Sequence, residues 1–112
     1  MSDKDIYLLF TEAMASSDRD YFVAEWPTSS VFPEDSDLTA NADLCGEIWD
    51  AAHITIRAIR QHTGLSQVAF ATRYLIPRRT LEDWESKKRE PTLFTKIALV
   101  KLTGVIPLRI WE

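Results

Sequence analysis

Apolar residues recur at steps of three and four along most of the chain, a spacing that predicts helices rather than strands. Near the N-terminus a helix capped by Asp3 is predicted. It places five apolar side chains on one face: Ile6, Leu9, Phe10, Ala13 and Met14. A short second helix that ends near Trp26 is predicted from the capping-box-like spacing of Ser17 and Asp20. Residues 27–37, which include two prolines and show no periodicity, form a predicted loop.

A long helix is predicted from about Thr39 to His62, and Gly64 ends it because glycine readily adopts the positive φ common at helix C-termini. Gly46 lies inside this stretch and is a candidate weak point or break. The apolar stripe of the helix consists of Leu44, Ile48, Ala51, Ala52, Thr55, Ile56 and Ile59.

Two short helices follow. Ser66 is a good N-cap for a helix that runs to about Tyr74. Pro77 suits the opening of a helix that runs to about Ser86, because its fixed φ is helical and its missing N–H is not needed there.

A charged loop over residues 87–90 leads to a last helix, which starts at Pro91 and Thr92 and which Gly104 ends. The apolar tail, residues 105–112, is predicted to be extended. The chain is therefore predicted to be all-α.

The two short helices have a face that can pack and a face that can bind. Phe70, Ala71 and Tyr74 point one way on the first helix, and Leu81 and Trp84 do so on the second. Small Ala71 allows the two helices to approach closely at a steep angle. The helix Pro77–Ser86 must then project Arg78 and Arg79 outward from its first turn. A helix with two exposed arginines in its first turn can enter a DNA major groove and bond guanine edges.

Between Gly64 and Pro91 the chain is similar to the lambda-repressor/Cro-like (XRE-type) helix-turn-helix family. The similarity spans roughly residues 57–103. The elements that match are Gly64-Leu65-Ser66-Gln67, Phe70-Ala71, Ile76-Pro77, Thr80-Leu81, Trp84-Glu85 and the basic stretch that ends at Pro91. The resemblance implies a lambda-repressor-like helix-turn-helix bundle, here preceded by an additional helical N-terminal segment.

The resemblance also implies which side chains contact double-stranded DNA. By position, Gln67 and Thr80 become phosphate or anchoring contacts. The candidates that read bases are Arg78, Arg79 and Asp83, and those that grip adjacent phosphates are Lys87, Lys88 and Arg89. For the basic loop, a solvated surface remains the plain alternative.

This sequence departs from the family at two turns and at its end. Leu75 and Lys87 occupy positions where the family usually has glycine and where a positive φ is common. Either these turns take another shape or their strain is compensated. The family domain commonly has five helices, and only four are predicted from Arg57 onward, so the fifth is missing or replaced.

The formal net charge of −4 is an average over two unlike halves. Residues 1–56 contain twelve acidic and two basic side chains, whereas residues 57–112 contain eleven basic and five acidic ones. This asymmetry suggests a basic surface for a polyanion and an acidic part with another task. We divide the chain into an acidic helical segment, residues 1–38, which packs on the core or on a partner, and a DNA-binding domain with an apolar tail, residues 39–112.

Other chemistry has little support in the sequence. Cys45, His53 and His62 are the only cysteine and histidines, and their spacing does not match a metal site. With three glycines the chain has no glycine-rich phosphate loop. We therefore expect no enzyme, cofactor or metal. The lone cysteine, the lack of a signal peptide and the lack of a long apolar run predict a cytoplasmic protein without membrane contact.

The sequence predicts a sequence-specific transcriptional regulator that inserts the helix Pro77–Ser86 into the major groove. An antitoxin and a repressor of a phage or mobile element are two forms that such a protein takes. A homodimer is expected by analogy, because binders of this type usually need two recognition helices. The acidic N-terminal half is a candidate surface for a protein partner. The alternative is a protein-interaction module that keeps the helix-turn-helix fold but has lost DNA recognition.

Overall fold

The structure is a computed structural model that describes all residues, 1–112. It consists of seven α-helices and two 3-10 helices without any strand, which confirms the predicted all-α class. The chain forms two compact units. The first unit comprises Met1–His53 together with Ile106–Glu112, and the second comprises Ile54–Val105. The proposed division after residue 38 rested on charge and motif rather than on packing, and it stays a prediction.

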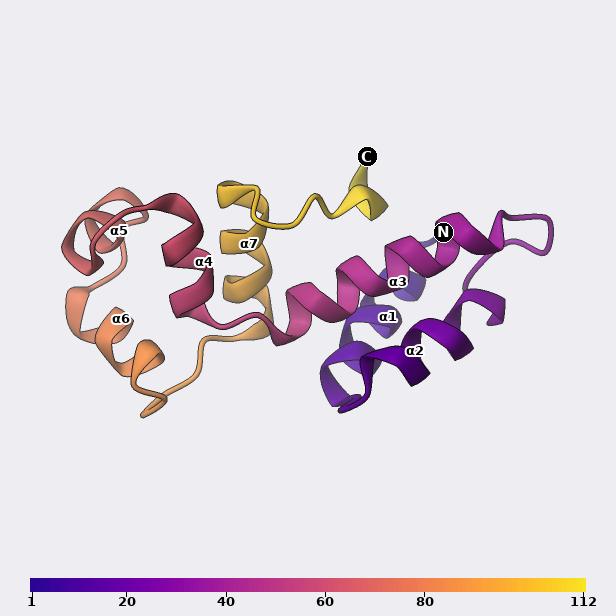
Figure 1. The fold of residues 1–112 in the computed structure, drawn as a ribbon, viewed down its shortest axis with the longest axis horizontal. Helices are drawn as coiled ribbons and strands as arrows, with labels where there is room; N and C mark the ends of the chain where they lie inside the picture. Colours follow the sequence, from indigo (N-terminus) through magenta and orange to yellow (C-terminus); the bar gives the residue numbers. More distant parts are fainter. The chain divides into compact units, whose positions relative to one another are not determined.

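In the first unit, α1 and α2 both pack against α3 (Figure 1). The unit is built from α1 (Asp3–Ala15), α2 (Arg19–Glu25), η1 (Trp26–Thr28), α3 (Leu38–His53) and η2 (Arg109–Trp111). Side chains from each end of the chain close its core, where Leu9, Phe22, Ile48 and Leu108 are fully buried. Burial of these apolar groups is the main stabilising contribution to the unit.

The tail is an integral part of the first unit rather than an extended end, which corrects the prediction. Residues 109–111 form η2, and the Trp111 ring stacks on Phe10 with ring centroids 5.3 Å apart. Arg109 donates its backbone N–H to Glu47 over 3.0 Å, and the two side chains form an ion pair. These partners are distant in sequence, so the local pattern of the tail could not reveal them.

The start of α1 also differs from the prediction by one residue. Ser2, not Asp3, is the N-cap: its hydroxyl accepts from the backbone N–H of Asp5 over 3.2 Å. The Asp5 carboxylate accepts from the Ser2 N–H over 3.1 Å and completes a capping box. Asp3 is the first helical residue, where the positive end of the helix dipole stabilises its negative charge.

The prediction of one long helix over residues 39–62 was wrong, because the structure has two helices there. The first, α3, ends at His53, and α4 (Ile56–Thr63) begins after Thr55. The Thr55 hydroxyl accepts from the backbone N–H of Ala58 over 3.1 Å. Threonine can thus offer the backbone an alternative to a continuous helix. Gly46, the suspected break, lies within α3 and is buried.

In the second unit, α4 packs against α7 and α6, and α5 packs against α6 (Figure 1). Its helices after α4 are α5 (Gln67–Arg73), α6 (Arg78–Glu85) and α7 (Leu93–Thr103). The predicted stops are confirmed: Gly64 and Gly104 follow α4 and α7 with φ of 73° and 71°. The predicted Ser66 cap is confirmed as well, since its hydroxyl accepts from Ala69 N–H.

Candidate nucleic-acid interface

Apolar contacts between α5 and α6 fix the geometry of the site. Phe70 and Ala71 on α5 and Leu81 on α6 are buried, and the Phe70 ring is in tilted contact with Tyr74 at 4.8 Å. Pro77 lies just outside α6 as its N-cap, with an extended ψ of 132°, rather than in the first turn. With Leu81 turned inward, the first turn of α6 presents its arginines on the opposite side.

The turn from α5 to α6 has the left-handed conformation that glycine usually supplies. Leu75 has a φ of 57° and follows the C-cap, Tyr74. The backbone N–H of Ile76 donates to the carbonyl of Ala71 over 2.9 Å, and that of Leu75 donates to Thr72 over 3.4 Å. These two bonds form a Schellman motif with leucine at its glycine position. The Leu75 side chain is 91% exposed.

The turn after α6 repeats this arrangement. Lys87 has a φ of 64°. The backbone N–H of Lys88 donates to Asp83 over 2.9 Å, and that of Lys87 donates to Trp84 over 3.3 Å. Of the two explanations left open for these turns, the structure supports the second: their shape is retained, and hydrogen bonds offset the backbone strain.

Two arginines project from the first turn of α6. The side chain of Arg78 is 64% exposed and lies 3.2 Å from the Glu82 carboxylate; that of Arg79 is 79% exposed and lies 3.6 Å from Asp83. Both pairs have i,i+4 spacing, which is worth only about 0.3–0.5 kcal/mol on an exposed helix. Both guanidinium groups are therefore available to a stronger anionic or acceptor partner.

Four of the candidate residues form one cluster, the Asp83 cluster, which consists of Arg79, Thr80, Asp83 and Arg89. Arg89 Nε lies 3.1 Å from Asp83 Oδ2, and Arg89 Nη2 donates to Thr80 Oγ1 over 3.3 Å. The Asp83 side chain is only 15% exposed. Two arginines, Arg79 and Arg89, therefore cover its carboxylate.

Gln67 lies in a different network, around Glu85. Its Nε2 donates to Glu85 Oε1 over 3.3 Å. Arg60 forms two bonds to the same carboxylate, from Nε over 2.7 Å and from Nη2 over 2.9 Å, and Arg57 Nε lies 3.4 Å away. The Glu85 side chain is only 1% exposed. Its bonds to Arg57 and Arg60 on α4 and to Gln67 on α5 hold these two helices against α6.

The charge state of this network follows from its hydrogen bonds. The bond from Arg60 lowers the pKa of Glu85, and burial opposes this shift only in part. The same bond raises the pKa of Arg60. Arg57 and Arg60 were not predicted as site residues, although their spacing of one helical turn on α4 allows both to meet one acidic partner.

The remaining candidates, Lys87 and Lys88, are exposed just beyond α6. Together with Arg78 and Arg79 they make the end and the first turn of α6 strongly basic. The second unit as a whole contains ten basic and four acidic side chains. Its field therefore attracts polyanions, whatever the overall charge of the chain.

Other reactive features are few. The structure has no group of three or more metal-ligating side chains that could hold an ion. Cys45 is buried, and burial raises the pKa of its thiol to about 12, so the reactive thiolate is strongly disfavoured. None of the helices is both long and apolar enough to span a membrane.

Comparison with known families supports the reading of this geometry. A helix-turn-helix family model matches residues 56–111, which is half of the chain. The match spans α4 to α7 and ends in η2, a single 3-10 turn where the family commonly has a fifth helix. Neither the curated proteins nor the solved structures provide a match to the chain.

The packing of α5 against α6, the retained turns and the exposed arginines in the first turn of α6 define a DNA-binding helix-turn-helix domain. The chain belongs to the helix-turn-helix family, in its lambda-repressor-like (XRE-type) form, as the sequence predicted. This is a family of DNA-binding regulators.

Proposed function

We propose that this protein is a sequence-specific DNA-binding transcriptional regulator that inserts α6 into the major groove. The observation that carries the proposal is the exposure of Arg78 and Arg79 in the first turn of a helix that a helix-turn-helix scaffold presents. Each arginine can bond both O6 and N7 of a guanine, which is worth about 1–3 kcal/mol of discrimination.

The residues around α6 act as phosphate contacts in this proposal. Lys87, Lys88 and Arg89 follow the helix and are exposed, so they can reach the backbone beside the groove. Thr80 and Gln67 contribute as neutral donors once DNA displaces their present partners, Arg89 and Glu85. Asp83 can accept a hydrogen bond from a base only if Arg79 or Arg89 moves away.

The working form is a homodimer, because two recognition helices about one helical turn of DNA apart read two half-sites. The exposed apolar side chains of α7 support this assignment. Phe94 and Leu102 are both exposed and lie about two helical turns apart on the same face. A second copy packed on this face would remove both side chains from water.

The alternative, an interaction module without DNA recognition, rested in part on Leu75 and Lys87. Both residues adopt the positive φ that glycine would supply, so the atypical residues leave the shape of the motif intact. Arg78 and Arg79 are exposed in the first turn of α6 as well. These two observations favour the DNA-binding function over the alternative.

Selection from a randomised 40-base-pair duplex library, followed by a salt titration of the enriched duplex, tests the proposal. Each contacted phosphate contributes about −0.9 to the slope of log K against log salt. Three basic contacts in each protomer of a dimer therefore predict a slope of about −5. The enriched duplexes should contain two half-sites about 10 base pairs apart.

Arg78→Ala/Arg79→Ala should abolish the preference for the enriched duplex and leave weaker, non-specific binding. A matched control is Lys4→Ala/Arg73→Ala, which removes the same charge from exposed positions outside α6. The control should retain the preference. Failure of wild type to enrich any sequence, or to bind duplex DNA at 50 mM salt, would refute the proposal and favour the interaction module.

An antitoxin and a repressor of a phage or mobile element remain two forms of the proposed regulator. Both use the same DNA interface. They differ in whether the acidic first unit binds a toxin. Co-purification with the product of an adjacent gene distinguishes them, because only the antitoxin form requires that complex.

A further inference from the structure

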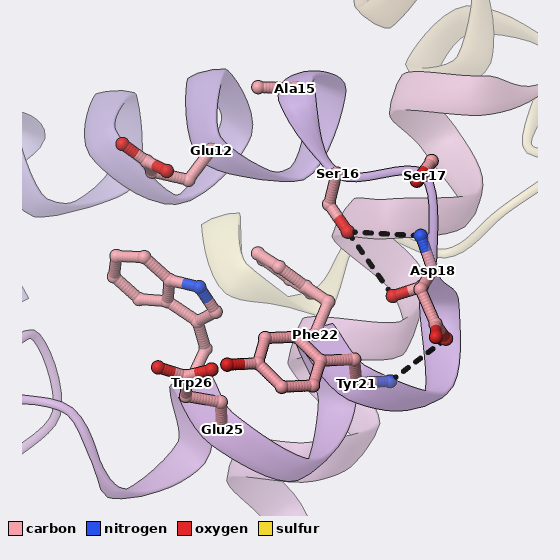
Figure 2. A pocket seen from close by; sticks show the side chains of 9 residues that line it. All are labelled: Glu12, Ala15, Ser16, Ser17, Asp18, Tyr21, Phe22, Glu25 and Trp26. Carbon is pink, nitrogen blue, oxygen red and sulfur yellow. Dashed lines mark hydrogen bonds between the residues drawn. The ribbon is translucent and has the colours of Figure 1, made fainter.

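The first unit contains a cleft that the DNA-binding function does not use. It lies beside the junction of α1 and α2 and has a volume of about 450 Å³. Figure 2 shows Glu12 on its α1 side and Tyr21, Glu25 and Trp26 on the opposite side. A volume in this range is enough for a ligand or for one or two large side chains.

The carboxylates of this cleft have no cationic partner within the chain. Glu12, Asp18 and Glu25 line it, and none of them takes part in an ion pair. Two of the three bases in the first unit are engaged elsewhere, Arg19 with Asp50 and Arg109 with Glu47. The cleft is therefore strongly negative, in a unit that has thirteen acidic and three basic side chains.

Aromatic rings form the other part of the lining. Trp26 is half-buried and in contact with Phe22, with ring centroids 5.8 Å apart. The exposed Tyr21 lies beside Glu25, and the interaction with this carboxylate raises the pKa of the Tyr21 phenol. The Tyr21 ring is thus held beside a carboxylate at the cleft wall (Figure 2).

Carboxylates next to aromatic faces form a surface that complements an organic cation. The carboxylates attract the charge over several ångströms, and the rings accept the cation on their faces. The carboxylates and the negative ring faces would both repel an anion, and a neutral apolar group would satisfy only the rings. Arginine fits it well, because its guanidinium plane stacks on aromatic rings and bonds carboxylates in the same pose.

We propose that the cleft lined by Glu12, Tyr21, Glu25 and Trp26 is a docking site for an arginine or lysine side chain of a basic segment in a partner protein. The charge complementarity of the cleft and the lack of any internal cation in it support this occupant. The cleft belongs to the first unit and shares no residue with α6, so the proposal goes beyond DNA recognition and does not depend on it.

The test is a titration of the full chain with a hexa-arginine peptide, followed through backbone amide resonances by NMR. Saturable shift changes should concentrate in residues 12–26, and the amides of α6 should stay unchanged. Binding to N-acetylarginine amide and to spermine is measured alongside. The peptide should bind at least about tenfold more tightly than N-acetylarginine amide, because it can engage several carboxylates at once.

Two variants separate a built site from diffuse attraction. Glu12→Gln/Glu25→Gln should weaken peptide binding about tenfold, whereas Glu34→Gln/Asp35→Asn, an equal charge change in the exposed loop outside the cleft, should weaken it less than about twofold. Tyr21→Leu keeps all charges and should weaken binding about two- to fivefold through the lost ring. All of these positions are exposed, so folding is retained.

Three results would overturn the proposal. Equal loss of affinity in the cleft variant and the loop control, or shifts spread over the whole acidic surface, would indicate non-specific attraction. Spermine binding as tightly as the peptide would make a free cation the ligand. If the amide resonances of the cleft shift with protein concentration when no peptide is present, the occupant is a second copy of this chain. DNA binding by the same variants should be unchanged, so a failure here leaves the proposed function standing.

Discussion

Replacing Leu75 or Lys87 by glycine should stabilise the second unit. Both residues have a left-handed backbone, with φ of 57° and 64°. For a residue with a Cβ this conformation costs about 1–2 kcal/mol. Glycine removes that strain, but its greater freedom in the unfolded chain offsets about 0.4–1 kcal/mol of the gain. The expected net increase in the free energy of unfolding is about 0.5–1 kcal/mol for each substitution.

Neither substitution should remove stabilising packing. The Leu75 side chain is 91% exposed, and Lys87 is exposed as well. The two turns lie at opposite ends of α6, so their effects should add. The double variant is expected to gain about 1–2 kcal/mol, which for a domain of this size corresponds to an increase of roughly 4–16 °C in melting temperature.

The assay is urea denaturation followed through the amide resonances of residues 56–104, which reports on the second unit alone. Leu75→Ala and Lys87→Ala are the matched controls, because alanine removes the side chain but keeps the Cβ that causes the strain. They should change the free energy of unfolding by less than about 0.5 kcal/mol. The reverse substitutions, Gly64→Ala and Gly104→Ala, have open space around the added Cβ and should lose about 1 kcal/mol from backbone strain alone.

An equal gain of stability in the alanine controls and the glycine variants would contradict this prediction, because the side chain and not the backbone would then be the cause. Destabilisation of the unit by Leu75→Gly would contradict it too, because the leucine would then contribute packing in solution. Lys87→Gly has a second readout. If Lys87 contacts a phosphate, the variant should be more stable and yet lose about 0.9 per protomer from the salt slope of DNA binding, or about 1.8 for the proposed dimer.

Three further predictions concern the charged and apolar surfaces. Glu85→Gln should lower the free energy of unfolding at pH 7 by about 3 kcal/mol, as expected when a buried pair is broken. Because the pKa of Glu85 is lower in the folded state, its contribution to the free energy of unfolding is full above the unfolded pKa and is lost as pH falls through the folded pKa. In urea denaturation between pH 2 and 7, the free energy of unfolding should therefore fall less steeply with decreasing pH in the variant than in wild type. Asp83→Asn should tighten duplex binding about two- to tenfold by releasing Arg79 and Arg89, measured by fluorescence anisotropy; a lost preference at one base pair without tighter binding would instead make Asp83 a reader. Phe94→Ser/Leu102→Ser should give a monomer by light scattering, whereas an unchanged dimer would exclude this face of α7 as the interface.

The parts of the fold that local chemistry determines could be predicted from the sequence. Ser66 caps α5 through a bond to an amide three residues away, and Gly64 and Gly104 end their helices through their own φ. The buried and exposed positions of α6 also follow from its period, with Leu81 inside and Arg78 and Arg79 outside. Each of these features depends on residues within one or two turns of each other.

The features that escaped prediction depend on contacts between distant residues. The apolar tail has no local signal for packing on α3, which requires the Glu47 carboxylate and the Phe10 ring. The burial of Asp83 depends on Arg89, which lies in the loop after α6 and reaches back to the Asp83 carboxylate. Thr55 shows a different limit of prediction. The apolar pattern on either side of it continues as in one long helix, but its hydroxyl accepts a capping hydrogen bond and the helix is interrupted there.

The ion pairs on α6 bear on how this helix can bind DNA. Arg78 and Arg79 each pair with an acid one turn further along, at a gain of only about 0.3–0.5 kcal/mol per pair. A bidentate contact with guanine is worth about 1–3 kcal/mol of discrimination against another base, so even this difference between bases exceeds the gain from one pair. Replacing either ion pair by a guanine contact is therefore favourable, and the acidic partners do not block the arginines. By contrast, Arg89 has two partners, Asp83 and Thr80, so its release requires more energy. This difference predicts that Arg78 and Arg79 engage DNA first and that Arg89 follows once its bonds to Asp83 and Thr80 are broken.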